Sequence, residues 1–389
     1  MFTLFVFIVV LGLLVFVHEF GHFIAAKKQK IGIEEFGFGF PPRMVGVRKV
    51  AGKWQWIVGK RDVPYSGNTV YSLNWIPVGG FVRIKGEDHA DGEASQDPEN
   101  FSSRGAFARF TVIAMGVIFN TLLAIFLIAG GYLAGLPQVI QENISKHAVV
   151  NDRRIEVLAV LPGSPAERAG IKAGDAILRI EGAEIPSADG FRNRVTQAEG
   201  QSLGLAVRRE GEPIEITVVP EVLEATGKPG IGIGLAEVGT VRYPWWMALP
   251  QGAFTTFYLE KATVQAFGGM LRDLVLGKST GMDVAGPVGI AVLTGEAARQ
   301  GWTQLLQFTA ILSINLAVMN ALPFPALDGG RLLFIILEKI RRRPVSRKIE
   351  VVFHNIGFLL LLVLVFLVTV KDVSRFASPI VEWAKQLVQ

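Results

Sequence analysis

The chain has 389 residues, and its composition already limits the kind of protein that it can be. Half of the residues are hydrophobic, the mean hydropathy is positive, and the apolar residues gather in long runs, which is typical of an integral membrane protein. The chain contains no cysteine, so disulfides are excluded and a zinc site would have to use histidine and carboxylate ligands. The formal net charge is +5, and the basic residues lie beside apolar runs, which indicates membrane topology and not nucleic-acid binding.

The first apolar run, 1–26, is long enough to cross a bilayer as a helix and contains the stretch His-Glu-Phe-Gly-His at 18–22. Residues four apart on a helix share a face, so His18 and His22 can bind one ion while Glu19 reaches a water molecule at that ion. A chance match is the alternative, but ionisable residues in a membrane helix are costly unless they have partners. The pattern therefore predicts a zinc-peptidase site with two imidazole ligands and a carboxylate general base. A cleaved signal peptide is the weaker interpretation, because no basic region precedes the run.

The segment 27–105 opens with lysines, whereas nothing basic precedes the first span, so the positive-inside rule places the N-terminus outside the cell. Glycine and proline break any helical pattern in this segment. Short β-prone runs predict strands at 45–50, 54–58, 69–75 and 80–84. The composition fits a re-entrant β-hairpin at the membrane beside the metal, and it fits equally a small cytoplasmic β-subdomain with its own core.

Further apolar runs predict three more transmembrane helices. They lie at 106–136, at 302–322 within a region 302–330, and at 351–371. The region 240–300 is too polar to span comfortably and predicts an amphipathic helix on the outer membrane surface, followed by a loop. Basic residues flank the cytoplasmic ends of the spans, so both termini and the segment between the second and third spans are predicted to be extracytoplasmic.

Residues 150–222 form a polar insert with a recognisable local pattern. Ser164 is placed to cap a short helix that starts at Pro165, and Gly170 is placed to end it in the left-handed conformation. This pattern resembles the PDZ domains of membrane and envelope proteases. Such a module can bind a peptide or a C-terminus as an added strand, or it can only filter access sterically, and the sequence leaves both possibilities open.

A catalytic zinc ion needs a third protein ligand. Glu34 and Glu35 are candidates, but Asp328 fits better, because the third span should end at the same depth as the first and prolines and glycines break the helix there. The alternative is that Asp328 caps the helix that starts at Gly329. The remaining histidines of the chain are His89, His147 and His354.

Two separated motifs with compatible topology carry a resemblance to a known family. They are His18-Glu19-x-x-His22 and Asn320-x-x-Pro323-x-Pro325-x-Leu327-Asp328-Gly329. With the insert between them, the chain resembles the site-2 protease family of intramembrane zinc metalloproteases, and within it the bacterial regulator-of-sigma-E protease branch. The single PDZ module is a departure from the best-known Gram-negative members, which have two in tandem.

The resemblance implies a polytopic α-helical protein of the bacterial cytoplasmic membrane, with four transmembrane helices, a membrane-associated β-hairpin region and one inserted PDZ domain. It implies cleavage of transmembrane segments of single-pass proteins, such as anti-sigma factors or remnant signal peptides, in regulated intramembrane proteolysis. His18, His22 and Asp328 would hold Zn²⁺, and Glu19 would be the general base. Asn320 would bind the substrate backbone, or it would make an interhelical hydrogen bond.

The alternative function is a catalytically silent, PDZ-bearing membrane adaptor with a structural metal site. Structural zinc sites are usually closed by four protein ligands, whereas this sequence offers three convincing ones. The protease is therefore the favoured prediction.

Overall fold

The structure is a computed structural model, and it describes the whole chain except residues 60–62, 64, 66, 88–96, 141–143, 186, 210, 224–226, 279–284, 344 and 389, and the side chains of 347 and 375–388. The chain divides into two compact units. The helical unit comprises Met1–Gly130 and Leu249–Gln389, and the inserted domain comprises Gly131–Ala248.

Within the described residues, four helices are long and apolar enough to cross a membrane, as the hydropathy pattern predicts. They are α1 (Phe2–Lys28), α2 (Ala106–Ala134), α7 (Trp302–Ala321) and the portion Lys348–Ser374 of α9 (Arg347–Val388). α7 ends before the second motif, so residues 322–327 form a loop that leads into α8 (Asp328–Arg341). α9 continues well past the predicted end at 371, because the residues after the apolar run still form a regular helix.

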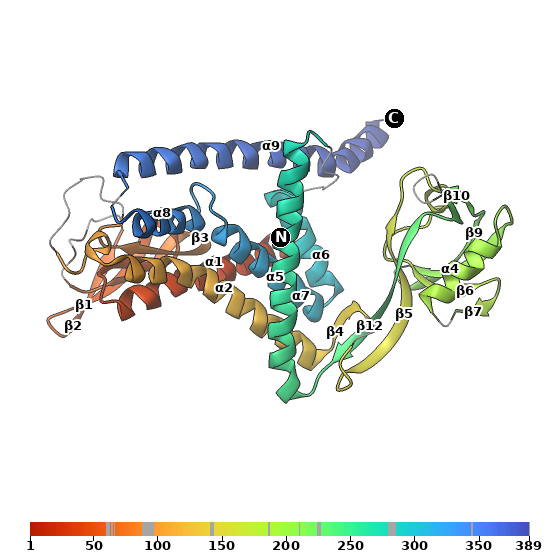
Figure 1. Cartoon of the computed structure of the whole chain (residues 1–389), viewed down its shortest axis with the longest axis horizontal. Coiled ribbons are helices and arrows are strands. Elements are labelled where there is room, and N and C mark those ends of the chain that lie inside the picture. Colours follow the sequence, from red (N-terminus) through yellow and green to blue (C-terminus); the bar gives the residue numbers. More distant parts are fainter. Residues whose placement is uncertain are drawn as a thin grey trace. The chain divides into compact units, whose positions relative to one another are not determined.

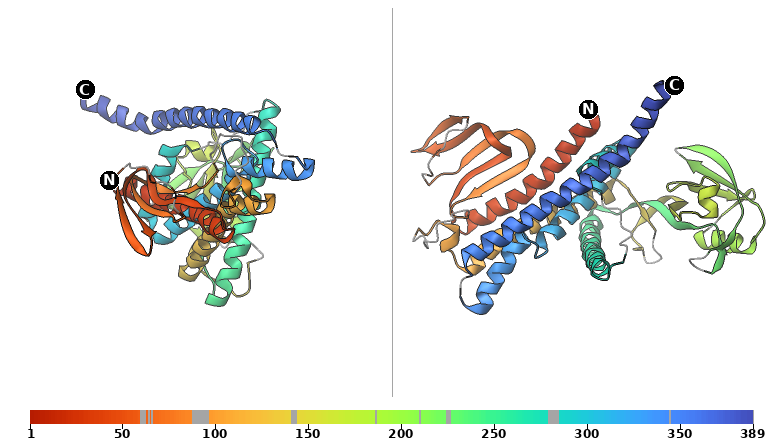
Figure 2. Two further views of the ribbon diagram at one scale, coloured as in Figure 1. Left: turned by 90° about the vertical axis from the view of Figure 1, so that its left-hand side faces the viewer. Right: turned by 90° about the horizontal axis from the view of Figure 1, so that it is seen from above.

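The long helices of the helical unit are not all aligned. In Figure 1 and in the right-hand view of Figure 2, the axes of α1 and α9 are roughly parallel. The N-terminal end of α1 and the C-terminal end of α9 lie on the same side. α5 (Trp245–Val275) runs steeply across them in Figure 1 and is seen end-on in the right-hand view of Figure 2. It packs on α2, where Thr121 Oγ1 donates to Glu260 Oε1 at 2.6 Å. A further helix, α6 (Pro287–Gln300), begins after Gly286, where Gly286-Pro287 is typical of a change from loop to helix.

The segment 27–105 forms a three-stranded sheet in the order β2-β1-β3. Its strands are β1 (Ile33–Val50), β2 (Lys53–Val58) and β3 (Val70–Ile84). The prediction of separate strands at 69–75 and 80–84 is wrong, because both belong to β3. β1 and β3 bend sharply, so that Phe38 pairs with Leu73 and also with Gly80. Gly39 and Gly79, both at φ +85°, allow the two bends, since glycine has no Cβ to clash in the left-handed region.

The bent sheet packs against α1. The Phe23 and Phe36 rings stack with centroids 4.4 Å apart, and Lys27 Nζ donates to Tyr71 Oη at 2.8 Å. Gly79 touches α1 so closely that a Cβ there would lie 2.6 Å from Val15. The sheet is thereby fixed beside the helix that carries the histidines.

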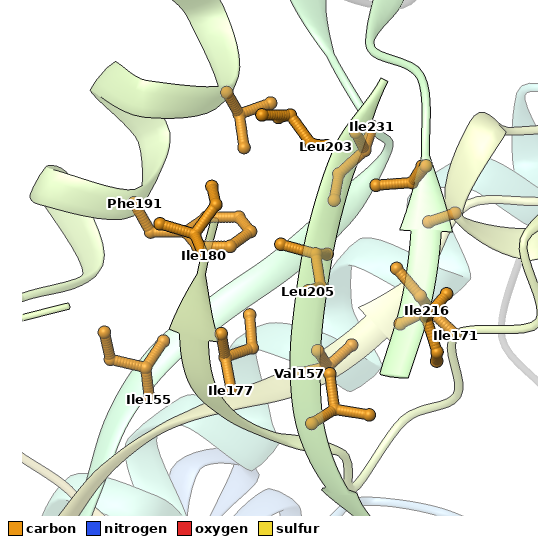
Figure 3. Close-up of a cluster of buried hydrophobic side chains, with 14 of the residues drawn as sticks. Ile155, Val157, Ile171, Ile177, Ile180, Phe191, Leu203, Leu205, Ile216 and Ile231 are labelled. Carbon is orange, nitrogen blue, oxygen red and sulfur yellow. The ribbon is translucent and has the colours of Figure 1, made fainter. Parts of the chain in front are cut away.

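The inserted domain is built on one antiparallel sheet in the order β4-β12-β5-β6-β8-β9. Its elements are β4 (Leu136–Val139), β5 (Val149–Val160), β6 (Ala176–Ile180), β7 (Ala183–Glu184), β8 (Leu203–Arg209), β9 (Glu212–Val218), β12 (Ile233–Arg242) and helices α3 (Pro165–Arg168) and α4 (Ala188–Gln197), with a hairpin of β10 (Glu221–Leu223) and β11 (Lys228–Gly230). Phe191 on α4 packs over Ile180 and Leu205 in the core (Figure 3).

For the inserted domain, the predicted helix capping is confirmed and the predicted boundary is wrong. Ser164 Oγ accepts from Glu167 N–H at 3.3 Å with Pro165 at the first helical position, and Gly170 has φ +80°, so the predicted capping is confirmed. The boundary 150–222 is too narrow, because β12 pairs along β5 and β4 pairs with β12. These partners are distant in sequence, so no local pattern announces them.

Candidate active site

The two motif histidines lie on one buried face of α1. His18 and His22 are 7% and 8% exposed, and their Nε2 atoms are 3.2 Å apart. The i, i+4 spacing that predicted a shared ligand face produces this geometry directly, because the intervening residues keep regular helical backbone.

Asp328 joins the two histidines from the other end of the chain. Its Oδ2 lies 3.0 Å from His18 Nε2 and 3.3 Å from His22 Nε2. Asp328 is the first residue of α8, and the residue at the cap position, Leu327, makes no side-chain cap hydrogen bond. The carboxylate is thus directed at the imidazoles.

The three atoms have the spacing that a metal ion requires. Ligand atoms about 2.0–2.2 Å from a tetrahedral zinc ion lie about 3.3–3.6 Å from one another, slightly more than the 3.0–3.3 Å between these atoms. Among the described residues they form a group that could hold a metal ion. Asp328 Oδ2 is buried and receives no hydrogen bond from the residues that the structure describes. An anionic oxygen left in that state is costly, and a bound cation would satisfy it.

A hydrogen bond on the far side of the His22 ring favours the tautomer that metal binding needs. His22 Nδ1 lies 2.9 Å from the carbonyl oxygen of Val112 on α2, so Nδ1 carries the proton and Nε2 keeps its lone pair. His18 Nδ1 lies 3.1 Å from the side-chain amide of Asn120, also on α2. Both imidazoles are therefore oriented by the neighbouring span.

Asn120 is a site residue that the sequence reasoning missed. It is fully buried, and its backbone carbonyl accepts from Ser313 Oγ of α7 at 2.8 Å. Its Oδ1 has no hydrogen-bond partner among the described residues, because the amide nitrogen is the atom that faces His18 Nδ1. A half-turn of the amide would let Oδ1 accept the His18 Nδ1 proton. A buried asparagine in an apolar span is the signal that could have found it.

Two glycines let α2 approach α1 closely enough for these bonds. A Cβ on Gly116 would lie 2.6 Å from His22 Nε2 and 2.7 Å from His18 Cε1. A Cβ on Gly21 would lie 2.4 Å from the Met115 carbonyl oxygen. Both approaches are closer than real Cβ atoms make, so a side chain at either position must displace the helices or the ligands.

Glu19 and Asn320 line a cavity of about 240 Å³ beside the metal-ligand group. The other residues at its wall are Val15, His18, Leu316, Ala326, Leu327 and Asp328. The cavity has room for several water molecules, each of which occupies about 30 Å³ in the liquid. Glu19 Oε2 accepts from the backbone N–H of Val82 in β3 at 3.1 Å, which holds the carboxylate at the edge of the sheet. Glu19 can thus contact both a water molecule in the cavity and the backbone of β3.

The other ligand candidates lie elsewhere. Glu35 is 4% exposed and accepts from Arg43 at 2.8 and 2.5 Å, and with Glu34 it lines a second cavity. His147 packs against Trp246 in the inserted domain, and His354 Nδ1 accepts from the Ala326 backbone. His89 lies outside the described residues.

Two histidines and a glutamate in a helix of membrane-spanning length, joined by an aspartate at the start of α8, form the arrangement of a membrane metalloprotease. The model of peptidase family M50 matches residues 6–59 and 62–364, and the chain belongs to this family, that of the site-2 proteases. It is a zinc metalloprotease by that membership.

Curated relatives agree over nearly the full length. "Putative zinc metalloprotease CPE1693" of Clostridium perfringens is 34% identical over 361 residues, covering 92% of this chain and 95% of the relative. "Regulator of sigma-W protease RasP" of Bacillus subtilis is 30% identical over 457 residues, covering 96% and 98%. Among solved structures, the PDZ domain of the SdrC-like protein of Listeria monocytogenes matches with 24% identity and a TM-score of 0.20, covering 21% of this chain and 86% of that domain.

Proposed function

We propose that the protein cleaves the transmembrane segments of single-pass membrane proteins within the bilayer, as a step of regulated intramembrane proteolysis. Anti-sigma factors and remnant signal peptides are the substrate classes expected from the family resemblance. The observation that carries the proposal is the convergence of His18, His22 and Asp328 beside Glu19 and a cavity, with both histidines in an apolar helix of spanning length. A relative named as a protease that regulates a sigma factor supports the anti-sigma class.

The roles of the site residues follow from their chemistry. His18, His22 and Asp328 would hold Zn²⁺, which supplies Lewis-acid polarisation of the scissile carbonyl and lowers the pKa of water. Glu19 takes a proton from the attacking water and later passes one to the leaving amine. Asn320, at the cavity wall, donates to the substrate backbone. The substrate must be extended there, because a helix hides its peptide bonds in its own hydrogen bonds.

We also propose the sidedness given by the charge bias, with both termini and the inserted domain extracytoplasmic. The cysteine-free sequence offers a direct test. A single cysteine at exposed Glu199 in the inserted domain should react with a membrane-impermeant maleimide in intact cells. A cysteine at exposed Lys53 of β2 should react only after permeabilisation. The reverse pattern would contradict this topology.

The inserted domain acts as a PDZ module in this proposal. The stretch 233–237 of β12 pairs with β5 on one side, and α4 contacts β12. β4 pairs with β12 from Val238 onward, and the Ile140 N–H just after β4 donates to the Glu237 carbonyl. Residues 233–236 of β12 therefore offer an edge to which an extended peptide or C-terminus could add. A purely steric filter would need no such edge.

The decisive experiment uses purified full-length protein with a single-pass substrate and maps the cut by mass spectrometry. Glu19→Gln should keep zinc but lower cleavage about 10²- to 10⁴-fold, the usual contribution of a general base. Glu199→Gln, an equal change at an exposed position, is the matched control, and a chelator should abolish cleavage by the wild type. Unchanged cleavage in Glu19→Gln would remove the mechanism, and bound zinc with no cleavage of any substrate would favour the adaptor.

A further inference from the structure

The loop that delivers Asp328 to the two histidines is short and conformationally demanding. It joins α7 to α8 through residues 322–327, which include Pro323 and Pro325. Ala326, two residues before the ligand, has φ +70°, in the left-handed region that costs free energy for any residue with a Cβ. Something outside the loop must therefore hold this conformation.

The fourth span supplies that support through His354. Its Nδ1 accepts a hydrogen bond from the backbone N–H of Ala326 at 3.0 Å. The ring also closes against the start of α8, where a Cβ on Gly330 would lie 3.2 Å from His354 Cε1, and its centroid is 6.1 Å from that of Phe334. The imidazole is therefore wedged between the loop and the helix that follows Asp328.

A second contact one turn along α9 reinforces the first. Gly357 packs so tightly on Pro325 that a Cβ there would lie 1.9 Å from the proline Cβ. Residues three apart share a helix face, so His354 and Gly357 form one small docking surface. Most of the rest of the span faces outward, since only 6% of its most apolar window is buried. Near its other end, Asp372 accepts from the Gly289 N–H at 2.7 Å.

The other ring nitrogen of His354 indicates why a histidine stands there. Nε2 is buried and has no hydrogen-bond partner among the described residues, which costs free energy that an apolar side chain would avoid. Since Nδ1 accepts from a backbone N–H, the ring is neutral with its proton on Nε2. The useful feature of a histidine at position 354 is thus its Nδ1, which accepts the hydrogen bond from Ala326.

We propose that His354 is a positioning residue for the reaction: by accepting from the Ala326 backbone it holds the loop so that the Asp328 carboxylate meets both imidazoles, which makes metal binding depend on the docking of the fourth span. The inference rests on the proposed metal-binding roles of His18, His22 and Asp328. His354 touches neither the metal site nor the substrate cavity, so it acts only through the loop.

The test measures the zinc affinity of the purified full-length protein by competition with a chelator, together with kcat and KM for a single-pass substrate. His354→Leu fills similar space without an acceptor and should lower zinc affinity about 10- to 100-fold, as the loss of a supporting contact does at other metal sites. His354→Asn presents its Oδ1 close to the position of Nδ1 and should stay within about threefold of the wild type. Asn355→Leu, the same kind of change at the exposed neighbouring position, is the matched control and should bind zinc as the wild type does.

With zinc in excess, His354→Leu should recover most of its kcat at unchanged KM, because the substrate cavity itself is intact. A wild-type zinc affinity in His354→Leu would overturn the inference, and so would an asparagine variant as weak as the leucine variant, since packing alone would then explain the position. If His354→Leu fails to fold, the zinc affinities of His354→Asn and Asn355→Leu are compared. Affinities within about threefold of each other support the inference, and a much weaker His354→Asn overturns it. Failure of the wild type itself to bind zinc would instead overturn the proposed function, and His18→Ala provides the reference for a lost site.

Discussion

The two compact units differ in how far their apolar side chains are covered. In the inserted domain the largest buried side chains are apolar, with Phe191, Ile180 and Leu205 at most 1% exposed. In the helical unit the polar side chains of His18 and Asn120 are buried, while the most apolar stretch of α9 is almost entirely uncovered. Burial in water selects apolar cores, whereas helices in lipid gain little from apolar burial and associate through close backbone contacts and hydrogen bonds. Substitutions in the two units should therefore fail in different ways.

The largest effect is expected in the apolar core. Phe191→Ala should destabilise the inserted domain by about 3–5 kcal/mol, because it leaves a cavity under α4. Zinc bound per chain should stay unchanged. Hydrogen exchange of the full-length protein would show lost protection in β6 and β8, and Leu158→Ala, at a half-exposed position on β5, is the control. Loss of zinc in Phe191→Ala would show that the two units are not independent.

The second prediction concerns the close contact between α2 and the histidines of α1 at Gly116. Gly116→Ala places a methyl group 2.6 Å from His22 Nε2 and should lower cleavage by about 100-fold or more, because a displacement of about 1 Å at a reacting centre has that effect. Gly130→Ala makes the same change on the same helix where nothing lies within 4 Å of the new Cβ, and it should be neutral. Equal rates for the two variants in a cleavage assay would contradict the packing account.

The orientation of His18 is a subtler target. Asn120→Ala removes the amide beside His18 Nδ1 and should weaken zinc binding about 10- to 100-fold, measured by chelator competition. Ser313→Ala removes only the hydrogen bond to the Asn120 backbone carbonyl and should weaken it less. If the two variants have the same affinity, the amide does not orient the ring.

The smallest effect is a pH dependence confined to the inserted domain. Asp175 is buried, which by itself raises the pKa of its carboxyl, but hydrogen bonds from Arg209 and the Lys172 N–H outweigh burial and lower the pKa. The stabilisation is therefore present above the unfolded value of about 3.9 and is lost as the pH falls below it. A fluorophore attached to the cysteine of the Glu199→Cys variant would report the thermal unfolding of the inserted domain. The midpoint temperature of that unfolding should fall between pH 5 and pH 3, and it should fall less when Asp175→Asn is added. An equal fall with and without Asp175→Asn would contradict this.

The sequence predicts those features that a local pattern encodes. The i, i+4 spacing of His18 and His22 places both rings on one helix face, and the charge bias beside the apolar runs indicates where Asp328 returns to the same depth. Ser164 and Pro165 predict their short helix correctly, because capping depends only on residues that are close in the sequence. These predictions concern neighbours along one helix or span ends at matched depths.

The features that could not be predicted from the sequence depend on contacts between residues far apart in the chain. β12 completes the sheet of the inserted domain only through pairing with β5, about eighty residues earlier. Gly116 looks like an ordinary member of an apolar span until α1 is packed against it, and the polar Asn120 does not reveal from the sequence that its partner is His18. The support of Ala326 by His354 likewise appears only when α9 docks on the loop. Packing between distant segments, and not local preference, decides these contacts.

The central claim is that two imidazoles of α1 and one carboxylate of α8 share a single zinc ion. X-ray absorption at the zinc edge of the purified full-length protein tests it most directly. The account predicts one zinc per chain with two imidazole nitrogens and oxygen ligands at about 2.0–2.2 Å, and loss of that signal in Asp328→Ala. An unaltered spectrum and zinc content in Asp328→Ala would contradict it.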